Sequence, residues 1–177
     1  MARAYQPKKT STKLVEGLTA GLIGGIIYII VTMIADAVTR GGDLLYTVAR
    51  IGAILAGPVN AAQGGSTPFG AQFLVGALLL LALFALLGIG FVSYLPIVFR
   101  LGLNKALFGA IYGVFIWLAV FFVLLGFINR DPANSLNIWV LLVSSVLGGA
   151  GIGLALDYVM SRKGGSDYGQ SEQAGNR

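Results

Sequence analysis

The stretch "LLVSSVLGGAGIGLALDYVM", residues 141–160, contains a run of closely spaced glycines: Gly148, Gly149, Gly151 and Gly153. A phosphate-binding glycine loop lies between a strand and a helix, where its backbone amides face water. This run instead lies inside a charge-free stretch from Pro132 to Leu156, which predicts an apolar helix. Ser145, Gly149 and Gly153 are spaced by four residues and share one helix face, so another helix can approach closely. We therefore interpret the run as a helix-packing surface rather than a nucleotide site.

The composition of the whole chain is that of a membrane protein. Its 177 residues are 56% hydrophobic and 11% charged, and the mean hydropathy of +0.84 is too high for a soluble domain, which needs a charged surface. The chain has no cysteine and no histidine, which removes the usual ligands of zinc, haem, copper and iron–sulfur clusters. We therefore expect no metal site and no intrinsic cofactor.

Charge-free stretches predict four transmembrane helices, because about 20 helical residues cross the ~30 Å hydrocarbon core of a bilayer. The four lie at residues 14–37, 71–99, 106–129 and 136–160. The second is longer than a perpendicular crossing needs and is expected to tilt or to bend near Pro96. Ser135 is the expected N-cap of the fourth. The first has a cleavable signal peptide as its alternative, but its apolar run exceeds the usual core of about 7–15 residues, so we retain it as a helix.

A shorter apolar segment, residues 44–57, does not fit a crossing. Its apolar residues form one helical stripe with Arg50 on the other side, and a Gly-Pro pair ends it. Such a helix is about 21 Å long, which is too short to span the bilayer. We expect it to lie along the outer interface as an amphipathic connector, or to re-enter the membrane and line a cavity, or to dock a partner. Arg50 is expected to reach water or to pair with Asp36 or Asp43.

The fold class predicted from these segments is all-α: a polytopic membrane protein with four transmembrane helices and one short interfacial or re-entrant helix. Nine of the twelve lysines and arginines lie in the basic tail 1–13, in the connection between the second and third helices, or in the polar tail 161–177. The positive-inside rule then places both tails in the cytoplasm. Such a fringe of cations suits anionic lipid headgroups, so the net charge of +5 requires no nucleic acid.

Small residues at four-residue spacing occur in the first and third predicted helices as well as in the fourth. A face of small residues lets two helix backbones come into van der Waals contact. The pattern therefore predicts a compact bundle held by close helix contacts. The residues expected to form these contacts are Gly17, Gly21, Gly25, Gly109, Gly113, Ser145, Gly149 and Gly153.

No charged residue is expected deep inside any of the four helices. Glu16 and Asp36 are 20 residues apart, about 30 Å along a helix, which places them near opposite membrane interfaces. Charges inside a membrane are costly and usually serve transport or proton relay. The chain also lacks the histidine, the paired carboxylates and the serine or zinc motifs of common catalytic sites. We therefore predict that the protein is not an enzyme.

Three aromatic residues are candidates for contact with a lipophilic ligand. Tyr28, Tyr112 and Trp117 lie within the predicted helices, where a lipid, a quinone or a pigment would bind through shape and aromatic contact. Trp117 has the alternative of packing inside the bundle. Trp139, near the outer edge of the fourth helix, is expected to be an interfacial anchor.

Several segments follow one another in a characteristic order along residues 17–156. They are "AGLIGGIIYIIVTM" (20–33), the short "ARIGAILAG" (49–57), a long apolar span, "LNKALFGAIYGVFIWLAVFFVLLG" (103–126) and a glycine-rich last span. This order resembles that of small four-helix bacterial inner-membrane proteins of unassigned function. Members of that set often carry a histidine at the start of the second span, where this chain has Gln72 and Phe73. The resemblance implies a bacterial origin, a place in the inner (cytoplasmic) membrane and no particular activity.

Two functions of different classes remain open. The first is a non-catalytic accessory or structural subunit of a larger membrane complex, which we expect to belong to respiratory or photosynthetic electron transport. Its partners would be the lipid bilayer and the other membrane subunits. The second is a small homo-oligomeric transporter or channel, with residues 44–57 as a re-entrant element. The expected absence of buried charge favours the subunit.

Overall fold

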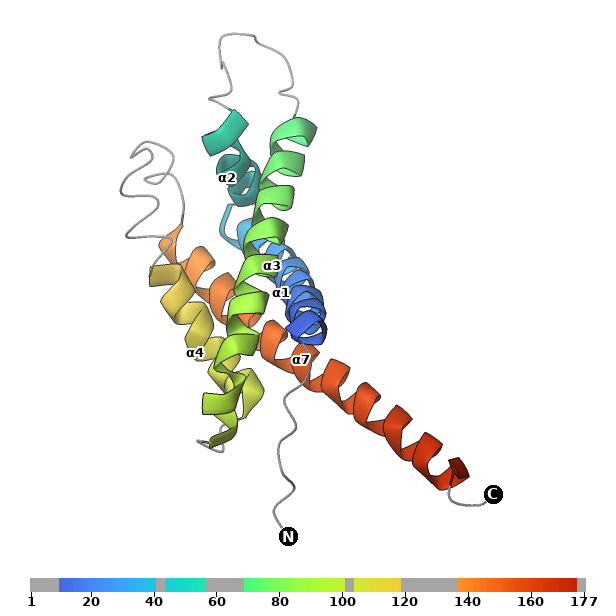
Figure 1. Cartoon of the computed structure of the whole chain (residues 1–177). Helices are drawn as coiled ribbons and strands as arrows, with labels where there is room; N and C mark the ends of the chain where they lie inside the picture. The colour runs from blue at the N-terminus through green and yellow to red at the C-terminus, as the bar shows by residue number, and fades with distance from the viewer. Residues whose placement is uncertain (1–9, 41–43, 57–68, 101–103, 119–136, 175–177) are drawn as a thin grey trace, which may run out of the picture.

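The structure is a computed structural model that describes residues 10–40, 44–56, 69–100, 104–118 and 137–174. These residues form five helices (Figure 1). The helices are α1 (Thr10–Arg40), α2 (Tyr46–Ala56), α3 (Phe69–Arg100), α4 (Lys105–Leu118) and α7 (Ile138–Ala174). The described part of the chain is therefore all-α, as the sequence predicts.

Three of these helices are long and apolar enough to cross a membrane. The qualifying segments are Lys13–Thr39 in α1, Gly70–Leu95 in α3 and Ile138–Ser161 in α7. They coincide with the first, second and fourth predicted spans. The third predicted span, residues 106–129, begins as α4, whose 14 residues are too few to cross a bilayer alone. Its remainder, from residue 119 onward, lies outside the described residues.

Two asparagines mark where α4 and α7 begin. The side-chain oxygen of Asn104 accepts a hydrogen bond from the Ala106 amide at 2.9 Å, and that of Asn137 accepts one from the Trp139 amide at 3.1 Å. An N-cap side chain of this kind satisfies one of the amides that have no partner at a helix start. The prediction that Ser135 caps the last helix is wrong, because α7 begins directly after Asn137.

The main packed helix pairs run antiparallel. α1 contacts both α3 and α7, α4 packs along α7, and α2 packs along the first part of α3 (Figure 1). Gly17 of α1 lies against Ile89 of α3, whereas Gly25, further along α1, lies against Leu81, which comes earlier in α3. The start of α1, the end of α3, the start of α4 and the C-terminal part of α7 are therefore at the same end of the bundle.

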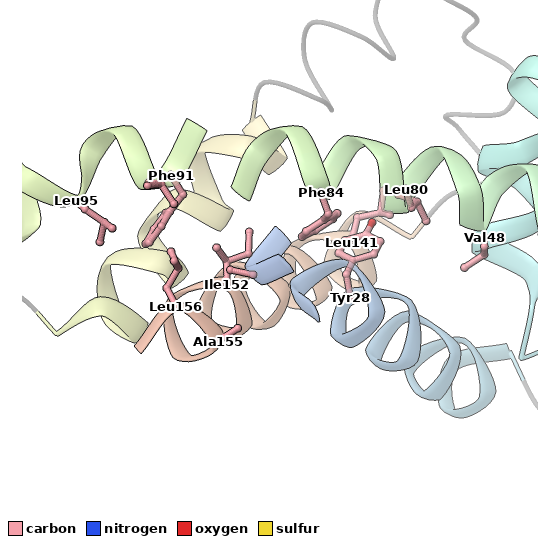
Figure 2. Packing of buried hydrophobic residues seen from close by; sticks show 12 residues of the cluster. Tyr28, Val48, Leu80, Phe84, Phe91, Leu95, Leu141, Ile152, Ala155 and Leu156 are labelled. Carbon is pink, nitrogen blue, oxygen red and sulfur yellow. The ribbon is translucent and has the colours of Figure 1, made fainter. Parts of the chain in front are cut away.

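The core consists of aromatic and aliphatic side chains between the helices (Figure 2). Tyr28, Phe84 and Leu141 bring α1, α3 and α7 together, and the ring centroids of Tyr28 and Phe84 are 5.0 Å apart. Phe91 of α3 is fully buried and contacts Phe108 of α4, with 5.4 Å between the ring centroids. Lipid is as apolar as these side chains, so inside a membrane such helices associate through tight packing rather than through exclusion of water.

Candidate functional site

The predicted small-residue faces of α4 and α7 lie against each other. A Cβ added to Gly109 would overlap the carbonyl oxygen of Gly149, and one added to Gly113 would overlap that of Ser145. Gly153 continues the contact further along α7, against the start of α4. The two backbones are thus in direct contact over successive turns, which larger residues at these positions would prevent.

The predicted face of α1 lies against α3. A Cβ on Gly21 would overlap the carbonyl oxygen of Phe84, and one on Gly17 would come within 2.9 Å of the carbonyl oxygen of Gly88. Gly25 faces side chains of the same stretch of α3. Gly88 completes the contact from the side of α3. No small residue lies four positions before or after Gly88, so spacing alone did not mark it.

A third close contact holds α2 alongside α3. Gly52 of α2 lies against the carbonyl oxygen of Gln72, and Gly76 of α3 lies against the carbonyl oxygen of Val48. Gly76 has no small residue four positions away and Gly52 has only Ala56, so the spacing of glycines and serines did not single them out. The contact aligns α2 with the first turns of α3 in the antiparallel direction.

One face of α1 is covered by neighbouring helices from Glu16 to Asp36. Its members recur every four residues and all are buried: Glu16, Ala20, Gly24, Tyr28, Thr32 and Asp36. Glu16 and Asp36 stand near the two ends of α1, yet they are only 2% and 0% exposed. Enclosure of both carboxylates by protein is a feature that the sequence did not indicate. It matters because desolvation of a charge is costly unless the charge is bonded.

Asp36 connects α1 to α2 through two hydrogen bonds. Its Oδ1 accepts one from the Thr47 hydroxyl at 2.7 Å, and its Oδ2 accepts one from the Thr47 backbone amide at 2.8 Å. Thr47 is the second residue of α2, so the Asp36 carboxylate caps this helix from outside and faces the positive end of its dipole. Bonds to a charged acceptor are about twice as strong as neutral ones. Asp36 therefore attaches the start of α2 to α1.

Arg50 is exposed on α2, as expected for a side chain that reaches water. Its guanidinium lies over the ring of Tyr46, 5.2 Å from the centroid, in a cation–π contact within the helix. Of the two carboxylates considered as its partner, Asp36 is bonded by the start of α2, and Asp43 lies outside the described residues.

Several hydroxyl groups in the helices bond to the backbone of their own helix. Thr19, Thr32 and Ser93 each donate to the carbonyl oxygen four residues earlier, at 2.9, 2.8 and 3.4 Å. This is a common way to satisfy a hydroxyl in an apolar helix. Ser144 is different among the described residues, because its hydroxyl is fully buried without a hydrogen-bond partner. It shares a face of α7 with Gly148, which packs against α1.

The structure places the three aromatic candidates at separate points of the bundle. Tyr28 is buried against Phe84 between α1, α3 and α7. Tyr112 is half-buried, and its hydroxyl donates to the Leu87 carbonyl at 3.2 Å, which links α4 to α3. Trp117 is partly buried and packs against the core. The described contacts of all three are with the protein's own helices.

Within the described residues, no group of three or more His, Cys, Asp or Glu side chains is placed to hold a metal ion. Comparison of the chain with protein families, with curated proteins and with solved structures gave no match. The close helix contacts, the two buried carboxylates and the C-terminal part of α7 are thus the features that bear on function.

Proposed function

We propose that the protein is a non-catalytic membrane subunit that acts by assembly with other membrane proteins, in a complex of the respiratory or photosynthetic kind. The observation that supports this most is the C-terminal part of α7. The apolar span of α7 ends at Ser161, but the helix continues to Ala174 and points away from the other helices (Figure 1). Such an element reaches beyond its own bundle, where it is available to a neighbouring protein.

The extension of α7 has the composition of a poor helix former. Its sequence, "RKGGSDYGQSEQA" at residues 162–174, contains three glycines. Each glycine costs about 1 kcal/mol relative to alanine in a helix interior. Isolated helices shorter than about 12–15 residues are marginal in water even with better composition. A helix at this place therefore calls for stabilisation from outside the bundle, which a partner subunit would supply.

The bundle itself supports a structural role. Its helices touch backbone to backbone between α1 and α3, between α2 and α3, and between α4 and α7. The Asp36 carboxylate and several hydroxyls are bonded within the chain. Closely packed helix contacts do not deform continuously. We therefore expect the bundle to behave as one rigid body. A rigid block of this kind suits a subunit that fills space and orders its neighbours.

The alternative function, a small homo-oligomeric transporter or channel, is favoured by one observation. Glu16 and Asp36 are buried on one face of α1, and buried carboxylates in membrane helices often mark ion or proton pathways. Between them, however, α7 closes that face: a Cβ added to Gly24 would come within 2.8 Å of the Gly148 carbonyl oxygen. A pathway between the carboxylates would require α1 and α7 to separate, so we rank this function second.

We further propose four crossings of the inner membrane, with both termini in the cytoplasm. Two observations support this topology. α4 runs antiparallel to α7 along its described length, as a third crossing would. The basic positions Lys13, Arg100, Lys105 and Arg162 belong to the same end of the bundle, as the positive-inside rule requires.

Extraction in a mild detergent followed by native electrophoresis tests the subunit role. The full chain is expected in a large heteromeric band, and a chain truncated after Ser161 is expected to insert into the membrane but to be lost from that band. Truncation after Ala174, which keeps all of α7, is the matched control and should assemble normally. A full chain that runs as a small homo-oligomer and conducts ions or a solute in liposomes would reverse the ranking of the two functions.

A further inference from the structure

α7 carries an exposed apolar stripe with an aromatic residue at each end. Trp139 is 70% exposed and Tyr158 is 58% exposed. At 3.6 residues per turn, the exposed members of the stripe fall within about 100° of the helix circumference. The opposite side of α7 packs against α1 and α4. The members of the stripe are Trp139, Val143, Leu147, Leu154 and Tyr158.

The length of this stripe matches the thickness of a bilayer core. Trp139 and Tyr158 are 19 residues apart, which is about 28 Å along a helix. The hydrocarbon core is about 30 Å thick. Trp and Tyr are enriched at its two boundaries, because each ring has an apolar body and a polar group. Charge begins at the level of Tyr158, where Asp157 is exposed and pairs with Lys105 at the start of α4.

α4 covers the same depth as the stripe of α7. The two helices are antiparallel and in register through their glycine contact, so Lys105 lies against Gly153 and Leu118 lies near the level of Val140. A helix of 14 described residues thus accompanies α7 over most of the distance between its two aromatic residues. Its outward face is also apolar and exposed, through Leu107, Ile111, Phe115 and Leu118.

We propose that lipid covers these two stripes, with the hydrocarbon core of the bilayer between the level of Trp139 and the level of Tyr158. The acyl chains contact the aliphatic middle of each stripe. The two aromatic rings lie at the boundaries, and the Lys105–Asp157 pair lies among the headgroups of the inner leaflet. This placement depends on membrane insertion alone and does not require the subunit role.

The alignment of α1 with α7 places α2 outside the hydrocarbon core. Tyr28 of α1 lies against Gly148, halfway along the stripe, so Asp36, about two turns further along α1, lies near the level of Trp139. Asp36 holds Thr47 at the start of α2. From there α2 extends beyond the ends of α4 and α7 (Figure 1). The short helix is therefore interfacial and not re-entrant, and it extends with the first turns of α3 through the outer headgroup layer toward water.

Fluorescence quenching by brominated lipids tests this placement on the full chain in phosphatidylcholine vesicles. In a Trp117→Phe background, Trp139 is the sole tryptophan, because the chain has two. Lipids brominated near the carbonyl end of the acyl chain should quench it more strongly than lipids brominated near the methyl end. In a chain without native tryptophan, a Tyr158→Trp reporter should behave likewise. A Leu147→Trp reporter, midway on the same exposed face, should show the reverse preference.

Each outcome of this experiment bears on the proposal. A Leu147→Trp reporter no deeper than Trp139 would overturn the proposed depth of α7 in the bilayer. Quenching of none of the reporters would show that protein, rather than lipid, covers the stripe. A membrane-impermeant maleimide tests α2 separately. Leu44→Cys, two residues before α2, should react from the outer side, whereas Leu86→Cys on α3 should stay protected by lipid although Leu86 is the more exposed of the two, at 68% against 46%. A protected Leu44→Cys would show that α2 is inside the hydrocarbon core.

Discussion

Replacement of Asp36 with alanine should detach α2 from α1 and destabilise the bundle. The substitution removes the acceptor of two buried hydrogen bonds, which the Thr47 hydroxyl and amide donate at 2.7 and 2.8 Å. A hydrogen bond to a charged group contributes about 1.5–3 kcal/mol, so the loss of both amounts to about 3–6 kcal/mol if α2 stays in place. Release of the start of α2 from α1 would reduce this cost, because the freed donors would then bond to water.

Substitutions at Thr47 and Asp36, with Thr39 as the control, separate the contributions of the two hydrogen bonds. Thr47→Val removes only the hydroxyl donor and preserves the shape of the side chain, so it should cost about 1.5–3 kcal/mol, half the value for Asp36→Ala. Asp36→Asn keeps one acceptor oxygen and should fall between these two. Thr39→Val is the control, because the Thr39 hydroxyl is exposed and bonds to Ala35 of its own helix. An exposed change of this kind is expected to stay within about 0.5 kcal/mol.

Unfolding in mixed micelles with increasing dodecyl sulfate, followed by far-UV circular dichroism, gives the free energy of unfolding for each variant. The double variant Asp36→Ala with Thr47→Val tests the coupling. Once the carboxylate is absent, removal of the Thr47 hydroxyl should cost little, so the two single effects should not add. The reasoning is refuted if Asp36→Ala is no more destabilising than Thr39→Val, or if the effects of the two substitutions are fully additive.

Two further predictions concern the glycine contacts and the topology. Gly149→Ala should destabilise the bundle, because its Cβ would overlap the Gly109 carbonyl oxygen, whereas Gly70→Ala, whose Cβ meets nothing within 4 Å, should stabilise α3 by about 0.4–1 kcal/mol. Thermal unfolding in detergent measures both, and equal effects would contradict the close contact. Single cysteines at Ser11 and Ser166 should react with an impermeant maleimide only from the cytoplasmic side, and reaction from opposite sides would exclude an even number of crossings.

The spacing of small residues predicts a helix contact only where the repeated small residues all lie in one helix. Positions i and i+4 lie on one side of a helix, so the small residues of α1, α4 and α7 mark the sides of these helices that lie in contact. Gly76 and Gly88 have no small residue four positions away in their own helix, and Gly52 has only Ala56. They come together because two helices cross at their positions, and the crossing point is set by the packing of the whole bundle. No pattern within one segment contains that information.

The burial of the two carboxylates could not be predicted from the sequence for a different reason. In a soluble helix, the alternation of polar and apolar residues shows which side faces the protein. In α1 the lipid-facing residues are as apolar as the core, so hydropathy marks where the helix enters the membrane but not which side is covered. The placement of Glu16 and Asp36 near opposite membrane interfaces stays a prediction, whereas their enclosure by other helices is evident only from the packing.

The position of these carboxylates also distinguishes assembly from transport. α1 is held to α3 through Gly17 and Gly88 and to α7 through Gly24 and Gly148, on two neighbouring sides. A movement that opens the face between Glu16 and Asp36 must separate α1 from α7, and it must break the bonds of Asp36 to α2 if α2 stays on α3. Van der Waals attraction falls steeply once backbones move apart, and lipid would not replace contacts of this closeness. A carboxylate used in transport is expected at a contact that can open, whereas these two lie at the ends of a face that glycine contacts hold closed, which favours the static role.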